Sequence, residues 1–379
     1  MTSELSSLCS YAKGKVSVDT LSKRNYVSTE NMMPNKGGIV DAGALPSAQY
    51  TQQYIKDDIL VSNIRPYFKK IWMADDDGGC SNDVLVFRAD RGCDSTFLYY
   101  ILANDAFFNY ASATSKGTKM PRGDKTAIMQ YKVPCFNYET QLRIGKLLRS
   151  IDDRIAVNKK INDNLYEMVN AYYTSLFKES DCEMTTVGNY AERIYSGGTP
   201  MTSNAAYWNG TFGWFSSGET RNRFVISTEK TITQAGIDNS STKLATKYDI
   251  VMASAGQGFT RGQTSMLLID TYVNQSVIVI KSERNILPYL FWNLVNRYDE
   301  LRAISDSSSI RGSLTTKMIA AFEIPLANEQ SLQAFADFAW SVIPQIENNL
   351  LENERLTALR DSLLPKLMSG EIDVTDIQL

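Results

Sequence analysis

Apolar residues recur every three to four positions from Glu139 to Phe177, and charged and amide residues fill the positions between them. No glycine or proline follows Gly145 in this stretch. The period predicts an amphipathic helix, about 58 Å long at about 1.5 Å per residue. A globular core rarely covers so long a stripe, so we expect a partner for it. The predicted stripe consists of Ile144, Leu147, Leu148, Ile151, Ile155, Ile161, Leu165, Met168, Val169, Tyr172 and Leu176.

A second helical stripe runs from Glu329 to Met368. Corresponding positions of the two stripes lie 191 residues apart, close to half of the 379-residue chain, as Ile151 and Val342 do. The sequence therefore predicts an internal duplication in which each long helix is the other's partner. The second stripe consists of Phe335, Phe338, Ala339, Val342, Ile346, Leu350, Leu356, Leu359, Leu363 and Leu367.

The segments that precede the two helices repeat one order of elements. β-Branched and aromatic residues predict paired strands, followed by a helix and a polar loop. In the first segment these elements fall at 58–74, 83–89, 95–113 and 115–125, and in the second at 249–263, 276–282, 288–305 and 305–316. The predicted architecture is α+β, with a domain over 1–138, a helix over 139–179, a domain over 180–328, and a helix with a C-terminal tail over 329–379.

Composition indicates a globular protein, because 43% of the residues are hydrophobic and 21% are charged. No run of eighteen apolar residues and no apolar N-terminal signal region occurs, so we expect a cytoplasmic protein with no membrane partner. The cysteine count is odd and lacks CxxC spacing, which favours free thiols in a reducing compartment. The cysteines are Cys9, Cys80, Cys93, Cys135 and Cys182.

The chain contains no histidine, which excludes Ser-His-Asp and Cys-His nucleophiles and histidine-ligated metals. It also lacks a GxxxxGK[ST] phosphate loop and the NPPY or DPPY turn that would hold a flipped adenine. We therefore expect no catalytic residue and no metal site. Two weak alternatives stay open: the GQG at 256–258 as a cofactor loop rather than a tight turn, and the acidic run 75–77 as a metal site rather than a hairpin tip. The net charge of −3 does not indicate nucleic-acid binding, although a local basic face would suffice for it.

Several short motifs occur in a fixed order on this repeat. They are YVSTENM (26–32), SGGTP (196–200), YWNGTFGWFSSGE (207–219), VNQS (273–276), IP followed by EQ (324–330) and LLPKLMSGEIDV (363–374). With the half-length duplication, these motifs make nearly the whole chain resemble the specificity subunit of Type I restriction–modification systems.

The resemblance implies two mixed target-recognition domains separated by two long antiparallel helices that form a coiled coil, with a pseudo-twofold repeat. It further implies a non-catalytic subunit whose domains each read half of a bipartite site in double-stranded DNA. The helices would set the gap, which at about 58 Å corresponds to about 17 base pairs. Two methyltransferase (M) subunits would bring S-adenosylmethionine. Restriction/translocase (R) subunits would bring ATP and Mg²⁺, and this chain itself would hold no cofactor.

Candidate DNA-binding residues are those able to pair with base edges or phosphates in the repeated loops. Surface charge is the alternative for each cation, and core packing is the alternative for the nearby aromatics Tyr67, Phe68 and Trp214. Arg122 and Arg311 recur in both halves, so they would brace the scaffold or hold phosphate rather than read sequence. The candidates are Asn63, Arg65, Lys69, Lys70, Lys116, Lys119, Arg122, Ser217, Glu219, Arg221, Arg223, Gln257, Arg261 and Arg311.

Four asparagines occupy matched positions of the two helical stripes. They are Asn158, Asn162, Asn349 and Asn353. A buried polar residue in a helix seam fixes register at some loss of stability, so these residues are candidates for aligning the helix pair. The alternative is that they are exposed caps or surface amides.

Two rival functions remain. One is a fused restriction–methylation enzyme, which would need an active site of unknown type. The other is a coiled-coil adaptor whose end domains bind proteins instead of DNA. Salt dependence would separate DNA reading from the adaptor, because phosphate contacts weaken steeply as salt rises.

Overall fold

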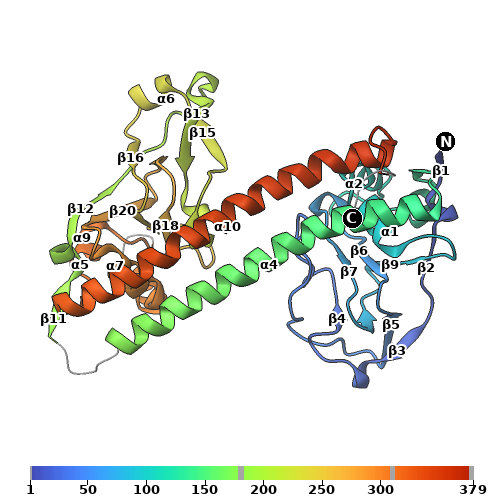
Figure 1. Ribbon diagram of the computed structural model, residues 1–379, viewed down its shortest axis with the longest axis horizontal. Coiled ribbons are helices and arrows are strands. Elements are labelled where there is room, and N and C mark those ends of the chain that lie inside the picture. The colour runs from blue at the N-terminus through green and yellow to red at the C-terminus, as the bar shows by residue number, and fades with distance from the viewer. Residues whose placement is uncertain (1, 178–182, 308–311, 375–379) are drawn as a thin grey trace. The chain divides into compact units, whose positions relative to one another are not determined.

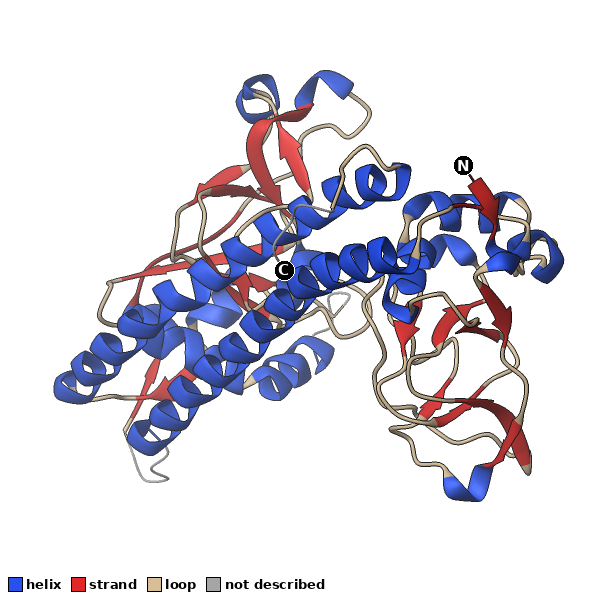
Figure 2. Cartoon of the chain, turned by 45° about the vertical axis from the view of Figure 1, so that its right-hand side comes forward, coloured by secondary structure: helices blue, strands red, loops and turns tan. Residues whose placement is uncertain are grey.

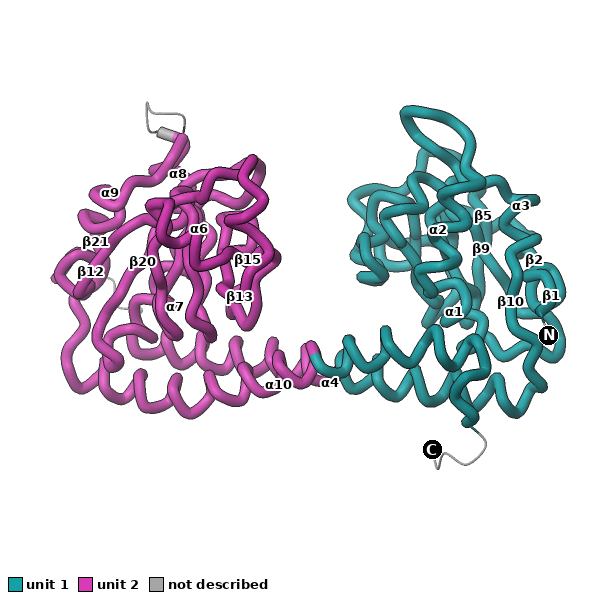
Figure 3. Tube along the Cα trace, turned by 90° about the horizontal axis from the view of Figure 1, so that it is seen from above, with its two compact units in different colours: residues 1–155, 355–379 teal, residues 156–354 magenta. Residues whose placement is uncertain are grey.

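The computed structural model describes residues 2–177, 183–307 and 312–374. The chain forms two compact units, which are coloured separately in Figure 3. The first unit joins residues 1–155 to residues 355–379, and the second consists of residues 156–354. Each unit therefore contains one strand-rich segment and part of both long helices. The predicted four-part division with limits at 138, 179 and 328 stays a prediction.

Two long helices, α4 (Tyr138–Phe177) and α10 (Glu329–Ser369), confirm the predicted helical stretches to within one residue (Figure 1). Each begins after an asparagine cap. The Oδ1 of Asn137 accepts the backbone N–H of Thr140 over 2.8 Å, and Asn328 does the same for Ser331 over 2.8 Å. The two caps lie 191 residues apart, so the duplication includes the local signal that starts each helix.

Two sheets make up the strand-rich part of the first unit, besides a pair of short strands. The first sheet has the order β2 (Cys9–Tyr11), β9 (Val84–Ala89), β6 (Ile59–Ser62) and β7 (Ile71–Met73). The second has the order β3 (Lys15–Ser17), β5 (Tyr50–Tyr54), β8 (Gly78–Cys80) and β4 (Tyr26–Val27). The remaining elements are β1 (Thr2–Glu4) paired with β10 (Lys132–Pro134), α1 (Ser95–Ala103), α2 (Asp105–Ala113) and α3 (Lys125–Met129), and the 3-10 turns η1 (Leu5–Ser7), η2 (Val18–Thr20) and η3 (Pro66–Phe68).

The second unit is built in the same way. Its first sheet has the order β12 (Ala191–Ser196), β20 (Val277–Ser282), β17 (Ile250–Ala253), β18 (Thr264–Leu267) and β14 (Phe224–Val225). Its second sheet has the order β15 (Lys230–Ile232), β13 (Trp208–Phe215), β19 (Thr271–Val273) and β16 (Lys243–Ala245). The remaining elements are β11 (Met184–Thr186) paired with β21 (Glu323–Pro325), α5 (Val187–Tyr190), α6 (Gln234–Asp238), α7 (Leu287–Asn296), α8 (Tyr298–Ser307) and α9 (Thr316–Ala320), and the 3-10 turns η4 (Ala205–Tyr207) and η5 (Ser217–Arg221).

The strand orders confirm the predicted repeat. The order β2-β9-β6-β7 matches β12-β20-β17-β18, and each second sheet contains one parallel pair, β4 with β8 and β13 with β19. An ion pair recurs at matched places. Buried Asp58 binds Arg88 at 2.7 Å, and buried Asp249, 191 residues later, binds Lys281 at 3.3 Å.

In each unit the first sheet lies between the helices and the second sheet, as the strands and helices of Figure 2 show. Alternation along a strand produces these layers because successive side chains point to opposite faces. Ile59 and Val61 of β6 face the core formed with α1, α4 and α10, whereas Leu60 faces the second sheet. In β17, Ile250 and Val251 divide in the same way.

Two predicted helices are each broken in the structure. The helix expected over 95–113 is two helices, α1 and α2, with Asn104 between them, and the Oδ1 of Asn104 accepts the N–H of Ala106 over 2.9 Å. The short asparagine side chain competes with the helical backbone at this point. In the second unit, the helix expected over 288–305 breaks at Arg297 into α7 and α8.

The predicted stripes are wrong at three positions. Ile161, Met168 and Leu359 are 40%, 45% and 47% exposed. Tyr166 and Tyr173, which the stripe omitted, are buried. Their rings pack against α7, where Tyr166 stacks on Trp292 with ring centroids 5.8 Å apart. The buried face of α4 therefore packs both against α10 and against the strand-rich part of the unit.

Candidate nucleic-acid interface

The loop between β6 and β7, residues 63–70, carries four of the candidate residues. Two of them adopt left-handed backbone conformations, Arg65 with φ 50° and Lys69 with φ 52°, on either side of η3. The N–H of Arg65 donates to the carbonyl of Pro121 over 2.8 Å, and the N–H of Gly123 donates to the carbonyl of Asn63 over 3.1 Å. These bonds hold the loop beside the predicted basic loop 115–125, so the structure brings the two candidate segments of the first unit together.

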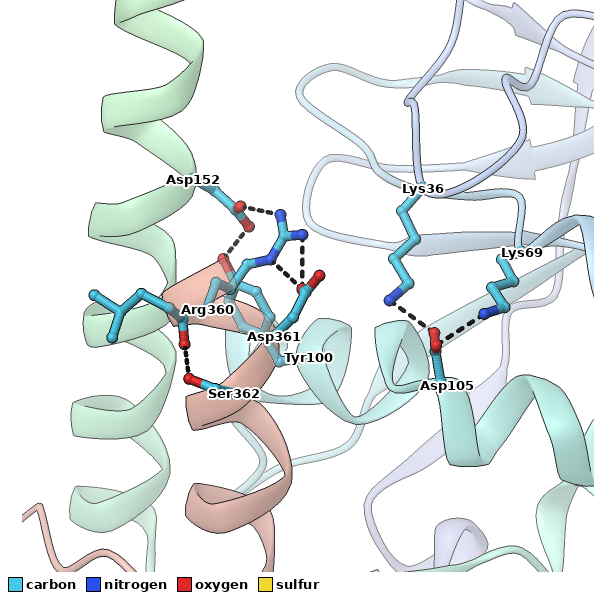
Figure 4. A network of polar contacts seen from close by, with 9 residues as sticks. Lys36, Lys69, Tyr100, Asp105, Asp152, Arg360, Asp361 and Ser362 are labelled. Atoms are coloured by element: carbon cyan, nitrogen blue, oxygen red, sulfur yellow. Dashed lines mark hydrogen bonds and ion pairs between the residues drawn. The ribbon is translucent and has the colours of Figure 1, made fainter. Parts of the chain in front are cut away.

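Basic side chains gather on these two loops and on the neighbouring segment 34–37. Lys36 and Lys69 both bind the carboxylate of Asp105, at 2.9 and 2.8 Å, as Figure 4 shows. The hydrogen bond from Lys69, followed by that from Lys36, holds the pKa of Asp105 below its ordinary value. The cations Lys36, Arg65, Lys69, Lys70, Lys116, Lys119 and Arg122 outnumber the neighbouring carboxylates of Glu30, Asp83, Asp105 and Asp124. The cluster is therefore basic although the chain is acidic overall.

Two further cations of this cluster are held by carboxylates. Lys116 binds Asp124 at 2.5 Å, and Arg122 binds Asp83 at 3.1 Å. Lys70 has no such partner among the described residues; its Nζ donates to the carbonyl of Thr29 over 2.6 Å, and burial lowers its pKa. Part of the positive charge thus already balances acidic side chains of the same unit.

Asn63 is a buried member of the candidate set. It is 7% exposed, and its Oδ1 has no hydrogen-bond partner among the described residues. The DNA-binding role of Asn63 stays a prediction. For Tyr67 and Phe68, core packing is not what the structure shows, since they are 52% and 39% exposed. Trp214 is packed, and its Nε1 donates to the carbonyl of Gly198 over 3.3 Å.

The corresponding loop of the second unit, residues 254–263 between β17 and β18, is shaped by glycine. Gly258 and Gly262 have φ of 61° and 84°, values that favour glycine. The exposed Gln257 lies at the tip. Arg261 binds Asp306 at 2.7 Å and also donates to the carbonyl of Gly312. Arg261 is thus anchored to α8 and to the segment that follows it.

Glu219 caps a turn, and its predicted role in reading DNA stays a prediction. It is 3% exposed, and both carboxylate oxygens accept backbone N–H groups, from Ser216 over 2.8 Å and from Glu229 over 2.9 Å. The turn after β4 in the first unit is capped in the same way, since the Oδ1 of Asn31 accepts the N–H of Ser28 over 2.6 Å. The hydroxyl of Ser216 also donates to Oε1 of Glu219 over 3.0 Å, so this carboxylate joins the turn to the segment at 229.

The other candidates of the second unit lie near this turn or outside the described residues. Half-buried Ser217 begins η5, and Arg221 pairs with Glu229. The guanidinium of Arg223 lies 4.1 Å from the ring centroid of Tyr166. Arg311 lies outside the residues that the structure describes, as does Cys182.

The two alternative small-molecule sites have structural explanations. The GQG sequence is part of the tip of the β17–β18 loop, and the Oδ1 of Asp77 accepts the N–H of Lys56 over 2.8 Å. Within 2–177, 183–307 and 312–374, no group of three or more potential metal-ligating side chains occurs.

The four helix asparagines meet in two pairs within the second unit. Asn158 donates from Nδ2 to the Oδ1 of Asn353 over 3.0 Å and to Glu352 over 2.8 Å, and Asn349 donates to the Oδ1 of Asn162 over 2.8 Å. Asn158 and Asn353 are 1% and 8% exposed, so these two are not surface amides. The contacts run in opposite directions along the two helices, which confirms the antiparallel arrangement.

Two features of the interface were not predicted. Phe259, in the β17–β18 loop, is 82% exposed. Lys36 joins the basic cluster because its N–H donates to the carbonyl of Lys69 over 2.8 Å. The repeat could have identified the first, because Phe259 lies 191 residues after Phe68. Nothing in the sequence indicated that Lys36 joins the cluster, because segment 34–37 meets loop 63–70 through a tertiary contact.

This fold defines a class of protein with two repeated double-sheet domains, each packed on an antiparallel pair of long helices. The family described as "Type I restriction modification DNA specificity domain" matches residues 1–167 and 179–354. The chain belongs to this family. DNA specificity is therefore its role, and the family is non-catalytic.

Individual relatives agree. The chain is 27% identical over 216 residues to the Type I restriction enzyme EcoR124I/EcoR124II specificity subunit of Escherichia coli, a match that covers 54% of this chain and 53% of that protein. It is 21% identical to the HindI specificity subunit of Haemophilus influenzae, with 92% and 94% covered. The crystal structure of a Type I restriction–modification S subunit from M. genitalium has the same fold, with a TM-score of 0.61, 17% identity, and 97% and 96% covered. Among the described residues, no helix is long and apolar enough to cross a membrane.

Proposed function

We propose that this chain recognises a bipartite site in double-stranded DNA, and that the strand-rich part of each unit reads one half-site. The observation that supports this most is the pair of matched loops, 63–70 and 254–263. They join equivalent strands of the two units, but their residues differ, RPYFKK at 65–70 against GQGFTR at 256–261. One scaffold with two different loops is what a reader of two different half-sites requires.

The basic cluster of the first unit supports DNA as the ligand. Base edges in the major groove are read by side chains, while lysines and arginines hold the phosphates. Lys69, Lys116 and Arg122 pair with carboxylates in the free chain, so DNA binding would exchange these ion pairs for phosphate contacts. We expect this exchange to make affinity fall as salt rises.

We further propose that two methyltransferase subunits bind this chain and that restriction/translocase subunits complete the nuclease, in the cytoplasm. A pseudo-twofold repeat offers two equivalent surfaces, which suits two copies of one partner. S-adenosylmethionine, ATP and Mg²⁺ would be bound by those partners, and this chain would supply position rather than chemistry.

The helix pair is proposed to fix the gap between half-sites. Its register is supported by the two asparagine pairs, because one shift along the seam would separate both donors from their acceptors. A helix seam made of leucine alone has no polar contact that distinguishes one register from another. The four asparagines thus stay candidates for alignment, now with contacts that explain how they would act.

The test is methylation mapping. The chain would be expressed with its cognate methyltransferase subunit in a host without other adenine methylation, and N6-methyladenine would be located by single-molecule sequencing. We expect one split motif with a methylated adenine on each strand, in its two halves. A stable complex that methylates nothing would instead favour the adaptor alternative.

A further inference from the structure

The most exposed large hydrophobic side chain among the described residues is Phe259. It is 82% exposed on the β17–β18 loop. Its match in the duplication, Phe68, lies on the equivalent β6–β7 loop and is 39% exposed beside Tyr67. A large aromatic side chain left in water is informative, because burial would be worth a few kcal/mol (about 1.5–3). Both units therefore hold a phenylalanine out of the core at the same place.

The backbone around Phe259 is fixed by α8. Tyr298 donates from its hydroxyl to the carbonyl of Phe259 over 2.6 Å, and Arg302 donates to the carbonyl of Gly258. Arg302 in turn binds Asp306 at 3.1 Å. Two successive carbonyls thus have donors on one helix. The side chain is exposed because the loop holds it there, not because the loop lacks contacts.

Phe68 is held in a comparable way. Its carbonyl accepts the N–H of Asn35 over 2.8 Å, and its N–H donates to the carbonyl of Arg65 over 3.0 Å. The ring packs beside Tyr67 with centroids 4.8 Å apart, and the Nζ of Lys70 lies 6.0 Å from its centroid. The first unit therefore presents an aromatic pair within the basic cluster.

The basic residues beside each phenylalanine indicate what kind of ligand the ring would contact. Lys69 and Lys70 directly follow Phe68, and Arg261 lies two residues after Phe259. An aromatic ring bordered by cations suits a nucleic acid, whose bases stack on aromatic faces while its phosphates meet the cations. Lys69 and Arg261 pair with Asp105 and Asp306 in the free chain, and phosphates could replace those carboxylates, whereas an apolar protein surface offers the cations nothing in exchange.

Phenylalanine stands at both position 68 and position 259, and this indicates how the two rings act. Residues that read different half-sites should differ, as Pro66 and Tyr67 differ from Gln257 and Gly258 at the same offset. Phenylalanine occurs in both halves, and base faces offer a stacking partner whatever the sequence. Apolar side chains that contact unstacked base steps act in this sequence-tolerant way.

We propose that Phe68 and Phe259 are a matched pair of DNA contacts that stack on base faces beside each half-site and supply affinity without sequence preference. This inference rests on the proposed function. It assigns the variable neighbours to reading and the shared phenylalanines to anchoring.

The experiment uses the full chain in complex with its methyltransferase subunits and the DNA site found by mapping. Affinity is measured for Phe259→Ala and Phe68→Ala, on the mapped site and on sites with one altered base pair, at several salt concentrations. 2-Aminopurine placed beside each half-site reports stacking. Leu244→Ala is the control, because Leu244 is 45% exposed on the other sheet of the second unit.

We expect each phenylalanine variant to weaken binding by about 5- to 100-fold. The loss should be equal for the mapped and altered sites, with the salt slope unchanged because no phosphate contact is removed. The 2-aminopurine signal should change only beside the half-site of the altered unit. Phe259→Trp should retain binding, and Leu244→Ala should match the parent chain.

Three outcomes would overturn the inference: unchanged affinity, a loss confined to one base pair of the motif, or a loss of methyltransferase assembly with DNA binding intact. Unchanged affinity would show that the two rings do not contact DNA. A loss confined to one base pair would show that they read sequence. A loss of methyltransferase assembly would show that the loop binds protein. If the parent complex fails to bind any split site, the proposed function itself fails, which is a separate result.

Discussion

The side-chain amide of Asn158 donates to the Oδ1 of Asn353 over 3.0 Å, and the duplication repeats this bond in reverse. Moving 191 residues along the chain converts Asn158 into Asn349 and Asn162 into Asn353. The second bond, from Asn349 to Asn162 over 2.8 Å, is therefore the image of the first.

Replacing both donors, in Asn158→Leu with Asn349→Leu, should destabilise the chain and broaden the gap between half-sites. Each change leaves an acceptor on the facing helix without its partner, at about 1–3 kcal/mol for a buried one. Urea unfolding and the spacing in the methylation motif measure the two effects. Asn164→Leu with Asn348→Leu, at exposed positions beside the pairs, is the control. Unchanged stability together with an unchanged gap would refute the register role.

Asp152→Ala should lower the free energy of unfolding by about 2 kcal/mol or more. Asp152 accepts the hydroxyl of buried Tyr100 over 2.6 Å and the guanidinium of Arg360 over 2.7 Å, which ties α4, α1 and α10 together in the first unit (Figure 4). Adjacent Asp153 pairs with Arg149, one turn away on the same helix, and both side chains are more than half exposed, so Asp153→Ala should cost no more than about 0.5 kcal/mol.

Tyr100→Phe provides the second step of that experiment. In the Asp152→Ala background the hydroxyl has lost its acceptor, so its removal should recover part of the stability. In the parent chain the same substitution should be destabilising. Equal effects in both backgrounds, measured by urea unfolding, would show that the two side chains are not coupled.

Glu219→Ala should lower stability and leave the DNA motif unchanged. The carboxylate caps η5 through Ser216 and binds the N–H of Glu229, and the loss of such a cap costs about 1–2 kcal/mol. Thermal unfolding and methylation mapping separate the two roles. Glu192→Ala, an exposed glutamate on β12, controls for charge. A motif altered in one half-site would return Glu219 to the base readers.

Lys119→Ala should weaken DNA binding equally across sequences and reduce the salt slope by about 1, as expected for a phosphate contact. Lys119 is exposed in the basic cluster, and its carbonyl accepts a bond from Arg65. Binding titrations at several salt concentrations give the slope. Lys13→Ala, an exposed lysine outside the cluster, should leave the slope unchanged.

Alkaline pH should destabilise the second unit in part through Tyr173. Burial raises the pKa of Tyr173 to about 12, and this phenol accepts the side-chain N–H of Asn293 over 2.9 Å. An unfolded tyrosine has a pKa of about 10. The folded chain therefore holds the proton more tightly, and this contribution is complete below pH 10 and lost as pH rises towards 12. The urea midpoint should fall over that range, and less steeply in Tyr173→Phe.

Periodicity and duplication predicted much of the fold from sequence. The long helices are visible because their caps and stripes are local, and matching one half to the other predicts that the two halves share one fold, although not the order of the strands in it. The break at Asn104 was missed because one asparagine inside an apolar pattern gives little warning. The exposed Met168 was misplaced because the stripe alone does not say which face the domain covers.

The candidate site was less predictable. Residue types identified the basic loops, and the structure places Lys69 and Arg122 on neighbouring segments, as a shared surface requires. The burial of Glu219 was not foreseen, because a carboxylate that caps a turn looks the same in sequence as one that faces solvent. Phe259 was overlooked although the offset from Phe68 was available, since an aromatic residue in a loop is ordinarily taken for packing.

The first unit joins residues 1–155 to residues 355–379, which lie on either side of the second unit in the sequence, and this has a consequence for synthesis. Leu364 and Leu367 of α10 lie in the same core as Leu5 and Phe97, near the start. A ribosome delivers these leucines after residues 156–354, so the unit that begins first cannot close its core until the second unit has been synthesised. The second unit, residues 156–354, is fully made by then. A nascent or prematurely ended chain would hold a finished second unit beside an open first core, which chaperones would meet as exposed apolar surface.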